Sequence, residues 1–322
     1  VLFRSKGIDG WRDPVVDLGD GYGHLGYSTL VHPGDTWEDM RDSLHTFVPQ
    51  VKERFCPNDP LAVSLRLSNA SVERLVADPA EVAALASFLR DQDLYIFTIN
   101  AFPYGSFKGT TVKERVYEPD WTTVDRVRYT TDIARLLVDI TREDIEPSIQ
   151  TAPLAFQPKV VNEAYVSAFT ENILQVVGFL MNLESETGKR VKLALEPEPA
   201  CYLETIPGTI DYFSTHIFTA SAARRVADIA GQPLSNAYQG IRRHLGVVLD
   251  IGHQSVQFED IAEDLAMLDD AGIPVFKLQP AAALDIPVVD DAVISDLERF
   301  TGDRKSTRLN SSHQIISYAV FC

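Results

Sequence analysis

Short apolar runs alternate with amphipathic segments along most of the chain, and this alternation constrains its fold more than any other feature. The runs have strand-like lengths, and the segments between them repeat apolar residues every three or four positions, as helices do. Strands that alternate with helices predict parallel βα units. The seven runs are Tyr27–Val31, Leu61–Leu67, Leu94–Ile99, Pro147–Gln150, Val191–Leu195, Leu245–Leu249 and Pro274–Leu278.

Two of the intervening segments carry clear helix signals. Between about Lys159 and Thr187, apolar residues recur at helical spacing, and Gly188 follows as a stop signal. Near the start of the chain, Asp35 and Glu38 have the spacing of a capping box, which predicts a helix that begins at Asp35.

Seven successive βα units favour an α/β fold of the (β/α)₈ or TIM-barrel type, truncated before its last strand. A doubly wound nucleotide-binding sheet is the alternative. It is less favoured, because no G-x-G-x-x-G follows the first run and the chain has no P-loop. Hydrophobic residues make up 45% of the chain, which is enough for the core of one large domain.

The two ends of the chain do not fit this pattern. Residues 303–322 resemble the conceptual translation of a sequencing adapter, as do residues 1–5. We therefore expect three segments: a leader or artefact (1–22), an incomplete barrel domain (23–302) and a tail that is not native (303–322). On this interpretation the natural protein continues past Gly302.

The formal net charge of −17 limits the partners of the chain. An acidic surface repels phosphate backbones and anionic membranes, which favours a small-molecule metabolite over a nucleic acid. Cys56 and Cys201 fit no metal or redox spacing, so we expect a reducing cytoplasm. No apolar run reaches the ~18 residues of a transmembrane helix, so we expect no membrane insertion. A homo-oligomer or partner proteins from the same pathway stay open.

The residue that follows each run is polar or charged in every case. In a barrel these positions share the rim at the carboxyl ends of the strands, where active sites form. Polar strand ends alone are common, so the chemistry of the last three carries more weight. The seven residues are His32, Ser68, Asn100, Thr151, Glu196, Asp250 and Gln279.

Glu196 follows an apolar strand, where a carboxylate loses solvation unless a cation lies beside it. We interpret Glu196 as a metal ligand and catalytic group, with a plain salt bridge as the alternative. Glu198 lies on the same side of the extended chain, between Pro197 and Pro199, and is a second catalytic candidate.

Asp250 and His253 form an Asp-x-x-His motif at the end of the sixth run. A carboxylate and an imidazole at this spacing can converge on one ion, whereas a lone histidine is more often structural. With Glu196 on the adjacent strand and Gln279 at the next strand end, the motif predicts a divalent metal site. Such ligands suit Mn²⁺, Mg²⁺, Co²⁺ or Zn²⁺ and do not choose among them.

The remaining candidates would bind substrate. The long segment from Asn100 to Trp121 is typical of a lid or binding loop whose aromatic rings stack on a sugar-like ligand and whose cations hold a phosphate or carboxylate. Alternatively, it packs on its own aromatics. Its candidates are Asn100, Phe102, Tyr104, Lys113 and Arg115, and Thr151 is a further candidate at the fourth strand end.

His32 and Arg66 complete the substrate-binding candidates. His32 precedes Pro33 and either positions a substrate or caps the following helix. Arg66 interrupts an apolar run, and a buried guanidinium needs acidic partners. A ligand contact and an internal ion pair are equally compatible with Arg66.

Several strings add a resemblance to a known family. Glu at the fifth strand, Asp-x-x-His at the sixth and a polar end at the seventh resemble the xylose isomerase-like barrel superfamily. Over about residues 23–287 the chain more closely resembles the EboE-type metabolite-traffic proteins of bacterial gene clusters, although Leu30 and Gly252 depart from that pattern. The strings are GHLGYSTLVHPGDTWED (Gly23–Asp39), LRLS (Leu65–Ser68), YIFTINAFPYGSFKGTTVKERVYEPDW (Tyr95–Trp121), LALEPEP (Leu193–Pro199), RRHLGVVLDIGH (Arg242–His253) and FKLQPAAAL (Phe276–Leu284).

The resemblance implies a divalent-metal-dependent isomerase- or epimerase-like enzyme that acts on a small sugar-like or phosphorylated metabolite through an enediolate-type intermediate. It also implies a further carboxylate ligand on a last strand beyond Gly302, so we expect the site in this chain to be partial. Three alternatives stay open: a non-catalytic metabolite-binding or carrier protein, an endonuclease IV-like phosphodiesterase, and a hydrolase or lyase that uses the same ion.

Overall fold

The computed structural model describes residues 23–32, 34–105, 113–281, 291 and 295. The expected leader (1–22) and tail (303–322) lie outside these residues, as does the end of the expected barrel domain (296–302).

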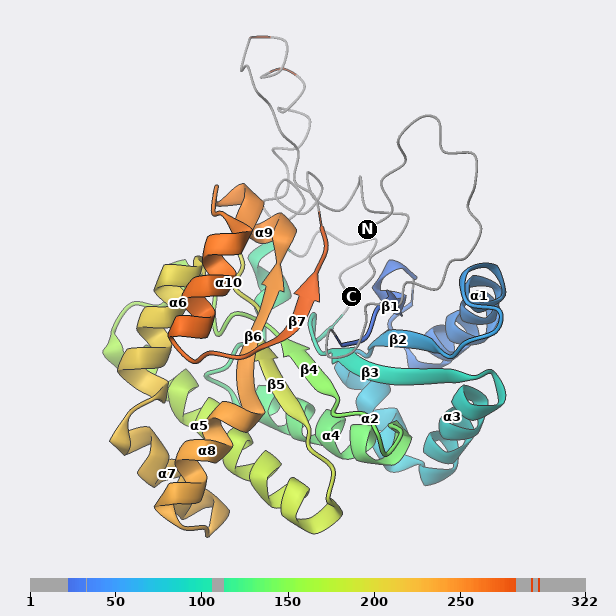
Figure 1. The fold of residues 1–322 in the computed structure, drawn as a ribbon, viewed down its shortest axis with the longest axis horizontal. Coiled ribbons are helices and arrows are strands. Elements are labelled where there is room, and N and C mark those ends of the chain that lie inside the picture. The colour runs from blue at the N-terminus through green and yellow to red at the C-terminus, as the bar shows by residue number, and fades with distance from the viewer. Residues whose placement is uncertain (1–22, 33, 106–112, 282–290, 292–294, 296–322) are drawn as a thin grey trace.

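Seven strands form one sheet, and their order in space is their order along the chain (Figure 1). Every neighbouring pair is parallel, as successive βα units require. Within the described residues β1 and β7 are the edges of the sheet, which forms a half-barrel. The predicted α/β barrel-type fold is confirmed. The strands are β1 (Gly26–Ser28), β2 (Leu61–Arg66), β3 (Leu94–Asn100), β4 (Ser148–Thr151), β5 (Lys192–Leu195), β6 (Leu245–Asp250) and β7 (Val275–Gln279).

The helices connect successive strands and lie outside the sheet, with α1 and α3 beside β1–β3 and α7 and α8 near β5 and β6 (Figure 1). They are α1 (Trp37–Phe55), α2 (Asn69–Ala77), α3 (Pro79–Asp91), α4 (Val124–Ile140), α5 (Glu163–Thr187), α6 (Ile206–Tyr212), α7 (Ala220–Ala230), α8 (Leu234–His244), α9 (Ile251–Val256) and α10 (Ile261–Asp270). Shorter helical turns are η1 (Thr29–Val31), η2 (Lys113–Tyr117), η3 (Gln157–Lys159) and the π-helical η4 (Phe213–Ile217).

The start of the chain differs from its predicted structure in two places. The first strand ends at Ser28, whose side chain accepts a hydrogen bond from Leu30 N and turns the chain into η1. The capping box lies one residue later than predicted, because Thr36 and Asp39 exchange the reciprocal bonds at the start of α1. Asp35 is therefore not the cap and contacts Arg66 instead.

The helix α5 is the longest helix of the described residues and packs against other helices. It begins at Glu163, after the cap residue Asn162, rather than near Lys159, and it ends at Gly188, which adopts the left-handed conformation expected of a stop. By length and composition alone α5 could cross a membrane, but 61% of its apolar window is buried within the fold. Packing against α4, α7 and α8 accounts for this apolar character.

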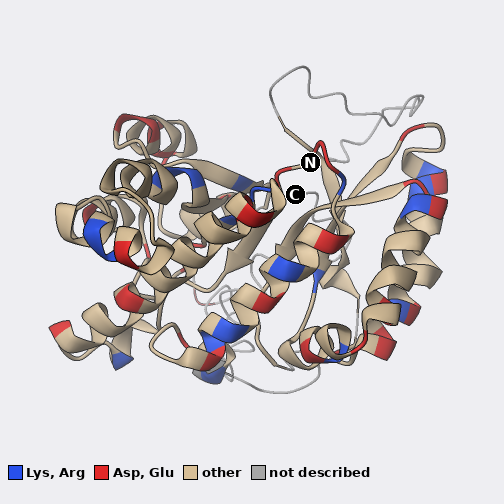
Figure 2. Cartoon of the chain, turned by 90° about the horizontal axis from the view of Figure 1, so that it is seen from below, with Lys and Arg blue, Asp and Glu red and all other residues tan. Residues whose placement is uncertain are grey.

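Both signs of charge are interspersed on the outer helices (Figure 2). Several opposite charges pair across neighbouring elements, such as Arg225 of α7 with Glu171 of α5 and Arg41 of α1 with Glu81 of α3. Exposed pairs of this kind contribute little to stability individually. The buried carboxylates Glu196 and Asp250 lie instead at the carboxyl ends of the strands.

Candidate metal centre

The ends of β5, β6 and β7 bring three predicted site residues to one place. Glu196 directly follows β5, Asp250 ends β6 and Gln279 ends β7. Since β5 pairs with β6 and β6 with β7, the three side chains project from adjacent positions on the rim. Each is almost fully buried, with 4%, 1% and 6% of its surface exposed, respectively.

The Asp-x-x-His motif has a local structural reason. Asp250 is the N-cap of α9: its Oδ1 accepts hydrogen bonds from Gly252 N at 2.8 Å and from His253 N at 3.3 Å. This cap occupies one carboxylate oxygen, while Oδ2 lies 3.9 Å from His253 Nε2. The motif therefore fixes both the turn into α9 and the approach of the two side chains.

The tautomer of His253 follows from its backbone contact. Nδ1 lies 3.1 Å from the carbonyl oxygen of Pro197. A carbonyl only accepts, so Nδ1 carries a proton, and in the neutral ring Nε2 is the nitrogen with a lone pair. Histidines that bind metals usually donate their other ring N–H to such a group, which fixes the orientation of the ring.

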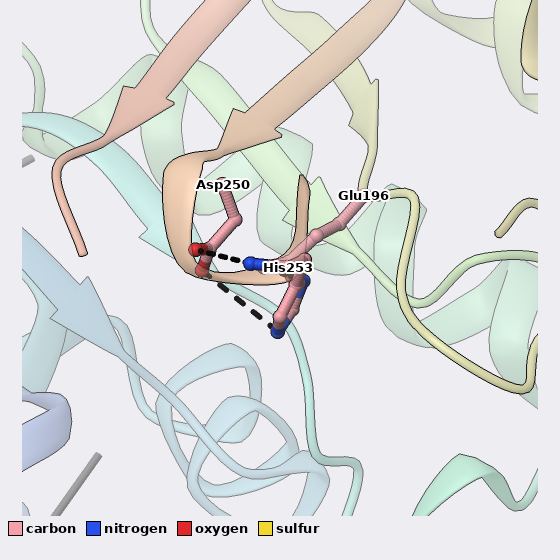
Figure 3. A group of neighbouring side chains, drawn as sticks. All are labelled: Glu196, Asp250 and His253. Carbon is pink, nitrogen blue, oxygen red and sulfur yellow. Dashed lines mark hydrogen bonds and ion pairs between the residues drawn. The ribbon is translucent and has the colours of Figure 1, made fainter. Parts of the chain in front are cut away.

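Glu196, Asp250 and His253 together form a buried group of three possible metal ligands (Figure 3). One ligand atom from each residue can be chosen so that all three lie within 4.8 Å of one another. Two carboxylates and one imidazole in a site of low polarity fit a divalent cation such as Zn²⁺ or Mn²⁺. These three side chains are therefore chemically suited to hold the divalent metal ion that the sequence predicts.

Gln279 lies between the two carboxylates and donates to both. Its Nε2 is 3.0 Å from Glu196 Oε1 and 2.5 Å from Asp250 Oδ2. The amide nitrogen therefore contacts both carboxylates as a donor. To bind a cation, Gln279 would have to rotate its amide and present its oxygen, so its role as a ligand stays a prediction.

Burial raises the pKa of the Glu196 carboxyl to about 7. His253 lowers this pKa, whereas Asp250 and Glu198 raise it through like-charge repulsion, and the hydrogen bond from Gln150 lowers it. A carboxylate that is costly to ionise beside other carboxylates gains most when a cation arrives. The electrostatics of the cluster therefore favour cation binding.

Two residues that the sequence did not single out contact Glu196 directly or through a neighbour. Gln150 of β4 donates through Nε2 to Glu196 Oε2 at 2.5 Å. Lys277 of β7 is 5% exposed and donates through Nζ to Gln150 Oε1. The signal for Lys277 was present, because it lies two residues before Gln279 and so on the same face of a strand.

The second catalytic candidate, Glu198, belongs to a neighbouring aromatic cluster. Its Oε1 accepts a hydrogen bond from the Tyr117 hydroxyl at 2.9 Å. Tyr117 stacks on Phe102, with ring centroids 5.6 Å apart. Burial, and secondarily the charge of Glu198, raise the pKa of Tyr117 well above its usual value, so Tyr117 stays a proton donor to Glu198. Phe102 is thus near a catalytic candidate, whereas its contact with substrate stays a prediction.

The other loop candidates have different surroundings. Tyr104 packs edge-on against Tyr129, at 5.0 Å between ring centroids, and lies over the Arg126 guanidinium at 5.5 Å. Both partners belong to α4, so Tyr104 packs on that helix, whereas the stack of Phe102 on Tyr117 fits the alternative in which the loop packs on its own aromatics. Arg115 is exposed on η2, and the side chain of Lys113 lies outside the described part of the structure.

The candidates His32, which follows η1, and Arg66, Asn100 and Thr151 of β2–β4 are engaged in internal contacts. His32 Nε2 lies 2.9 Å from the Tyr27 hydroxyl. Arg66 forms an ion pair with Asp35 at 2.8 Å, which is one of the two alternatives that the sequence left open. Asn100 Oδ1 accepts from Phe102 N at 3.1 Å, and Thr151 Oγ1 accepts from the Trp121 indole at 3.2 Å. Their roles in substrate binding stay predictions.

No family model matches the chain, and no curated protein matches it either. Among solved structures, a D-tagatose 3-epimerase-like protein is 16% identical, with a TM-score of 0.45 over 90% of this chain and 94% of that chain. A putative sugar phosphate isomerase/epimerase from Anabaena variabilis is 12% identical, with a TM-score of 0.48 over 80% of this chain and 73% of that chain.

A third similar structure is the IolI protein with a bound zinc atom. It is 14% identical, with a TM-score of 0.40 over 71% of this chain and 66% of that chain. The chain is thus similar, at low identity, to sugar isomerase- and epimerase-like proteins of known structure. Scores this low carry no argument about the chain, so the chemistry of the site rests on its own residues.

Proposed function

We propose that this chain binds a divalent metal ion through Glu196, Asp250 and His253, and that the site serves an isomerase- or epimerase-like reaction on a small sugar-like or phosphorylated metabolite. One observation carries the proposal: two carboxylates and an imidazole, all buried, gather within 4.8 Å at adjacent strand ends. Without a cation, such a cluster has an unfavourable charge balance.

A bound divalent ion supplies Lewis acidity, which polarises a carbonyl or hydroxyl oxygen and stabilises negative charge on it. The protein has two carboxylates that can move a proton beside that oxygen. Without a metal, burial raises the pKa of Glu196 to about 7, whereas an ion bound to Glu196 would keep the carboxyl ionised, as a proton acceptor must be. Glu198 is buried next to it and is oriented by the Tyr117 hydroxyl. Both residues are therefore assigned to proton transfer in this proposal.

The proposal extends to the family and the setting of the protein. A relationship to the EboE-type metabolite-traffic proteins is supported by the order in which the resembling strings occur along the chain. A small-molecule partner and a cytoplasmic setting are supported by the net charge of −17 and by Cys56 and Cys201, whose spacing fits no metal or redox motif.

Metal binding is the direct test. Calorimetric titration of the metal-free chain with Mn²⁺ and with Zn²⁺ should give one site that Glu196→Gln removes. Glu171→Gln is the matched control, because it makes the same chemical change at a surface ion pair with Arg225. Wild-type protein that binds neither ion, or equal affinity in Glu196→Gln, would contradict the metal site.

The reaction needs a separate readout. Incubation of the Mn²⁺-loaded chain with ketoses or ketose phosphates in D₂O should place deuterium on the carbon beside the carbonyl, detected by proton NMR. Glu198→Gln should abolish this exchange and keep the metal. Tight metal and ligand binding without exchange would favour the carrier alternative and overturn the catalytic part of the proposal.

A further inference from the structure

The buried Lys277 has no place in the function described so far. It lies on β7 with its side chain in the interior, whereas Leu278, the next residue, is 38% exposed on the outer face. A lysine is rarely buried to this degree, because the ammonium group loses its hydration. Its location two residues below Gln279 puts this charge directly beneath the metal centre.

The contacts of Lys277 are unusual for a buried cation. Its Nζ donates to Gln150 Oε1, a neutral amide oxygen from β4 on the other side of the interior. None of the described residues offers this ammonium a carboxylate at ion-pair distance. A buried lysine is normally balanced by an acidic partner. Here Lys277 contacts Gln150, and Gln150 in turn donates to the acidic Glu196.

The ammonium determines which way the Gln150 amide faces. A carboxamide has an accepting end and a donating end that are nearly equal in size, so it can rotate by half a turn. An ammonium has three donors and no acceptor, and it therefore tolerates only the amide oxygen. With that oxygen on Lys277, the amide nitrogen must face Glu196 Oε2, where it is found at 2.5 Å.

We infer that Lys277 is a positioning residue, which orients the Glu196 carboxylate through Gln150. Lys277 fixes Gln150, and Gln150 holds Oε2 of Glu196. The other oxygen, Oε1, lies 3.0 Å from Gln279 Nε2 and 3.7 Å from His253 Nδ1, and it is the oxygen that Gln150 does not hold. The role rests on the proposed metal site, but the orientation of Gln150 exists with or without a metal.

Two explanations of Lys277 predict opposite effects on metal affinity. If the ammonium acts only as a nearby positive charge, its removal should strengthen the binding of a divalent cation. If it positions Glu196, its removal should weaken binding, because Gln150 then rotates and Glu196 loses its fixed geometry. Groups that hold metal ligands in place typically account for a 10–100-fold change in affinity.

The experiment uses Mn²⁺ as the probe and the full chain with Lys277→Met, Gln150→Leu and both together. We expect Lys277→Met to weaken Mn²⁺ binding about tenfold, and to have no further effect in the Gln150→Leu background. Lys277→Arg should restore affinity, because a guanidinium is also a donor only. Unchanged or tighter Mn²⁺ binding in Lys277→Met, or additive effects of the two substitutions, would overturn the inference.

A metal-free measurement separates this inference from the proposed function. The side-chain amide protons of Gln150, assigned in NMR spectra by their loss in Gln150→Leu, should be protected from solvent exchange in the metal-free wild type. Lys277→Met should remove this protection. If the wild type binds no Mn²⁺ yet shows this pattern, the metal site fails and the positioning role of Lys277 stands. Protection that persists in Lys277→Met overturns the role.

Discussion

The polar residues near the ends of β1 and β2 and those at the ends of β5–β7 occupy equivalent positions on the rim, but their surroundings differ. At the end of β2, Arg66 is buried beside Asp35, and its guanidinium also donates to the carbonyl oxygens of Gly34 and Gly105. Each charge there has an opposite partner. At the ends of β5 and β6, Glu196 and Asp250 are both acidic, and both lie against the amide of Gln279 and the ring of His253.

The two regions show that the location of a polar residue on the rim does not determine its role. A polar residue after an apolar strand lies on the rim of a parallel half-barrel, whatever its chemistry. Whether it stabilises the fold or binds a ligand depends on the charges that face it. The region of β1 and β2 is balanced by its own residues, whereas the region of β5–β7 gathers two carboxylates whose charge a bound cation would balance.

Two substitutions that change side-chain shape very little, one in each region, test whether metal binding depends on the β5–β7 region alone. Asp250→Asn keeps the N-cap of α9, because asparagine caps as well as aspartate, but it removes a metal ligand. We expect metal affinity to fall by more than about 100-fold, the upper effect of groups that only support a ligand. Asp35→Asn should leave metal affinity unchanged and lower stability by about 1–2 kcal/mol, because the Arg66 guanidinium loses a charged acceptor.

Titration with Mn²⁺ and unfolding in urea, carried out on both variants, measure the two effects. The comparison fails if Asp35→Asn weakens metal binding as much as Asp250→Asn does, or if Asp250→Asn keeps the affinity of the wild type.

The raised pKa of Glu196 should make the free energy of unfolding depend on pH. Burial raises the pKa of Glu196 from 4.5 to about 7, so the folded state binds a proton that the unfolded state releases. This stabilisation is complete below pH 4.5 and is lost as the pH rises through about 7. By linkage it amounts to about 3 kcal/mol. The metal-free wild type should therefore lose stability over this range relative to Glu196→Gln.

Urea unfolding in the presence of a chelator, at half-unit steps from pH 4.5 to 8, measures this difference. Saturating metal should reverse it, because the ion binds the ionised carboxylate. Parallel pH profiles of the wild type and Glu196→Gln would show that burial does not raise the pKa of this group.

The strands could be predicted from sequence because burial on both faces produces continuous apolar runs. The observed ends of β3 and β6 lie within one residue of the predicted runs. The first strand was predicted too long, since Thr29–Val31 is as apolar as a strand, yet the Ser28 side chain starts a turn. A local hydrogen bond of this kind is not visible in hydrophobic periodicity.

The metal centre could be predicted in part. Glu196, Asp250 and His253 were found because their spacing relates directly to the ends of neighbouring strands. The pair Gln150 and Lys277 was not, because the two residues are 127 positions apart and meet across the interior. Likewise, Asp35 was interpreted as a helix cap, although its partner Arg66 lies 31 positions away. Alternation assigns a residue to a face, but it does not pair residues across that face.

Substitution of Thr151, at the end of β4, tests whether β4 belongs to the structural region of β1 and β2 or to the region of β5–β7. Thr151 ends β4, next to the metal centre, and it was predicted to bind substrate. Its Oγ1 accepts the Trp121 indole N–H at 3.2 Å, and both side chains are fully buried. Thr151→Val keeps the shape and leaves the indole without an acceptor, which should cost about 1–2 kcal/mol of stability. Metal and ligand affinity should not change.

Thr151→Ser is the matched control, because it retains the hydroxyl and should restore most of the stability lost in Thr151→Val. Urea unfolding and Mn²⁺ titration of both variants decide on which side of the boundary β4 lies. A loss of ligand or metal affinity in Thr151→Val, with stability unchanged, would move β4 into the functional region. Gln150, the preceding residue, already contacts Glu196. A purely structural effect at Thr151 would therefore place the boundary between two consecutive residues of one strand, whose side chains point to opposite faces of the sheet.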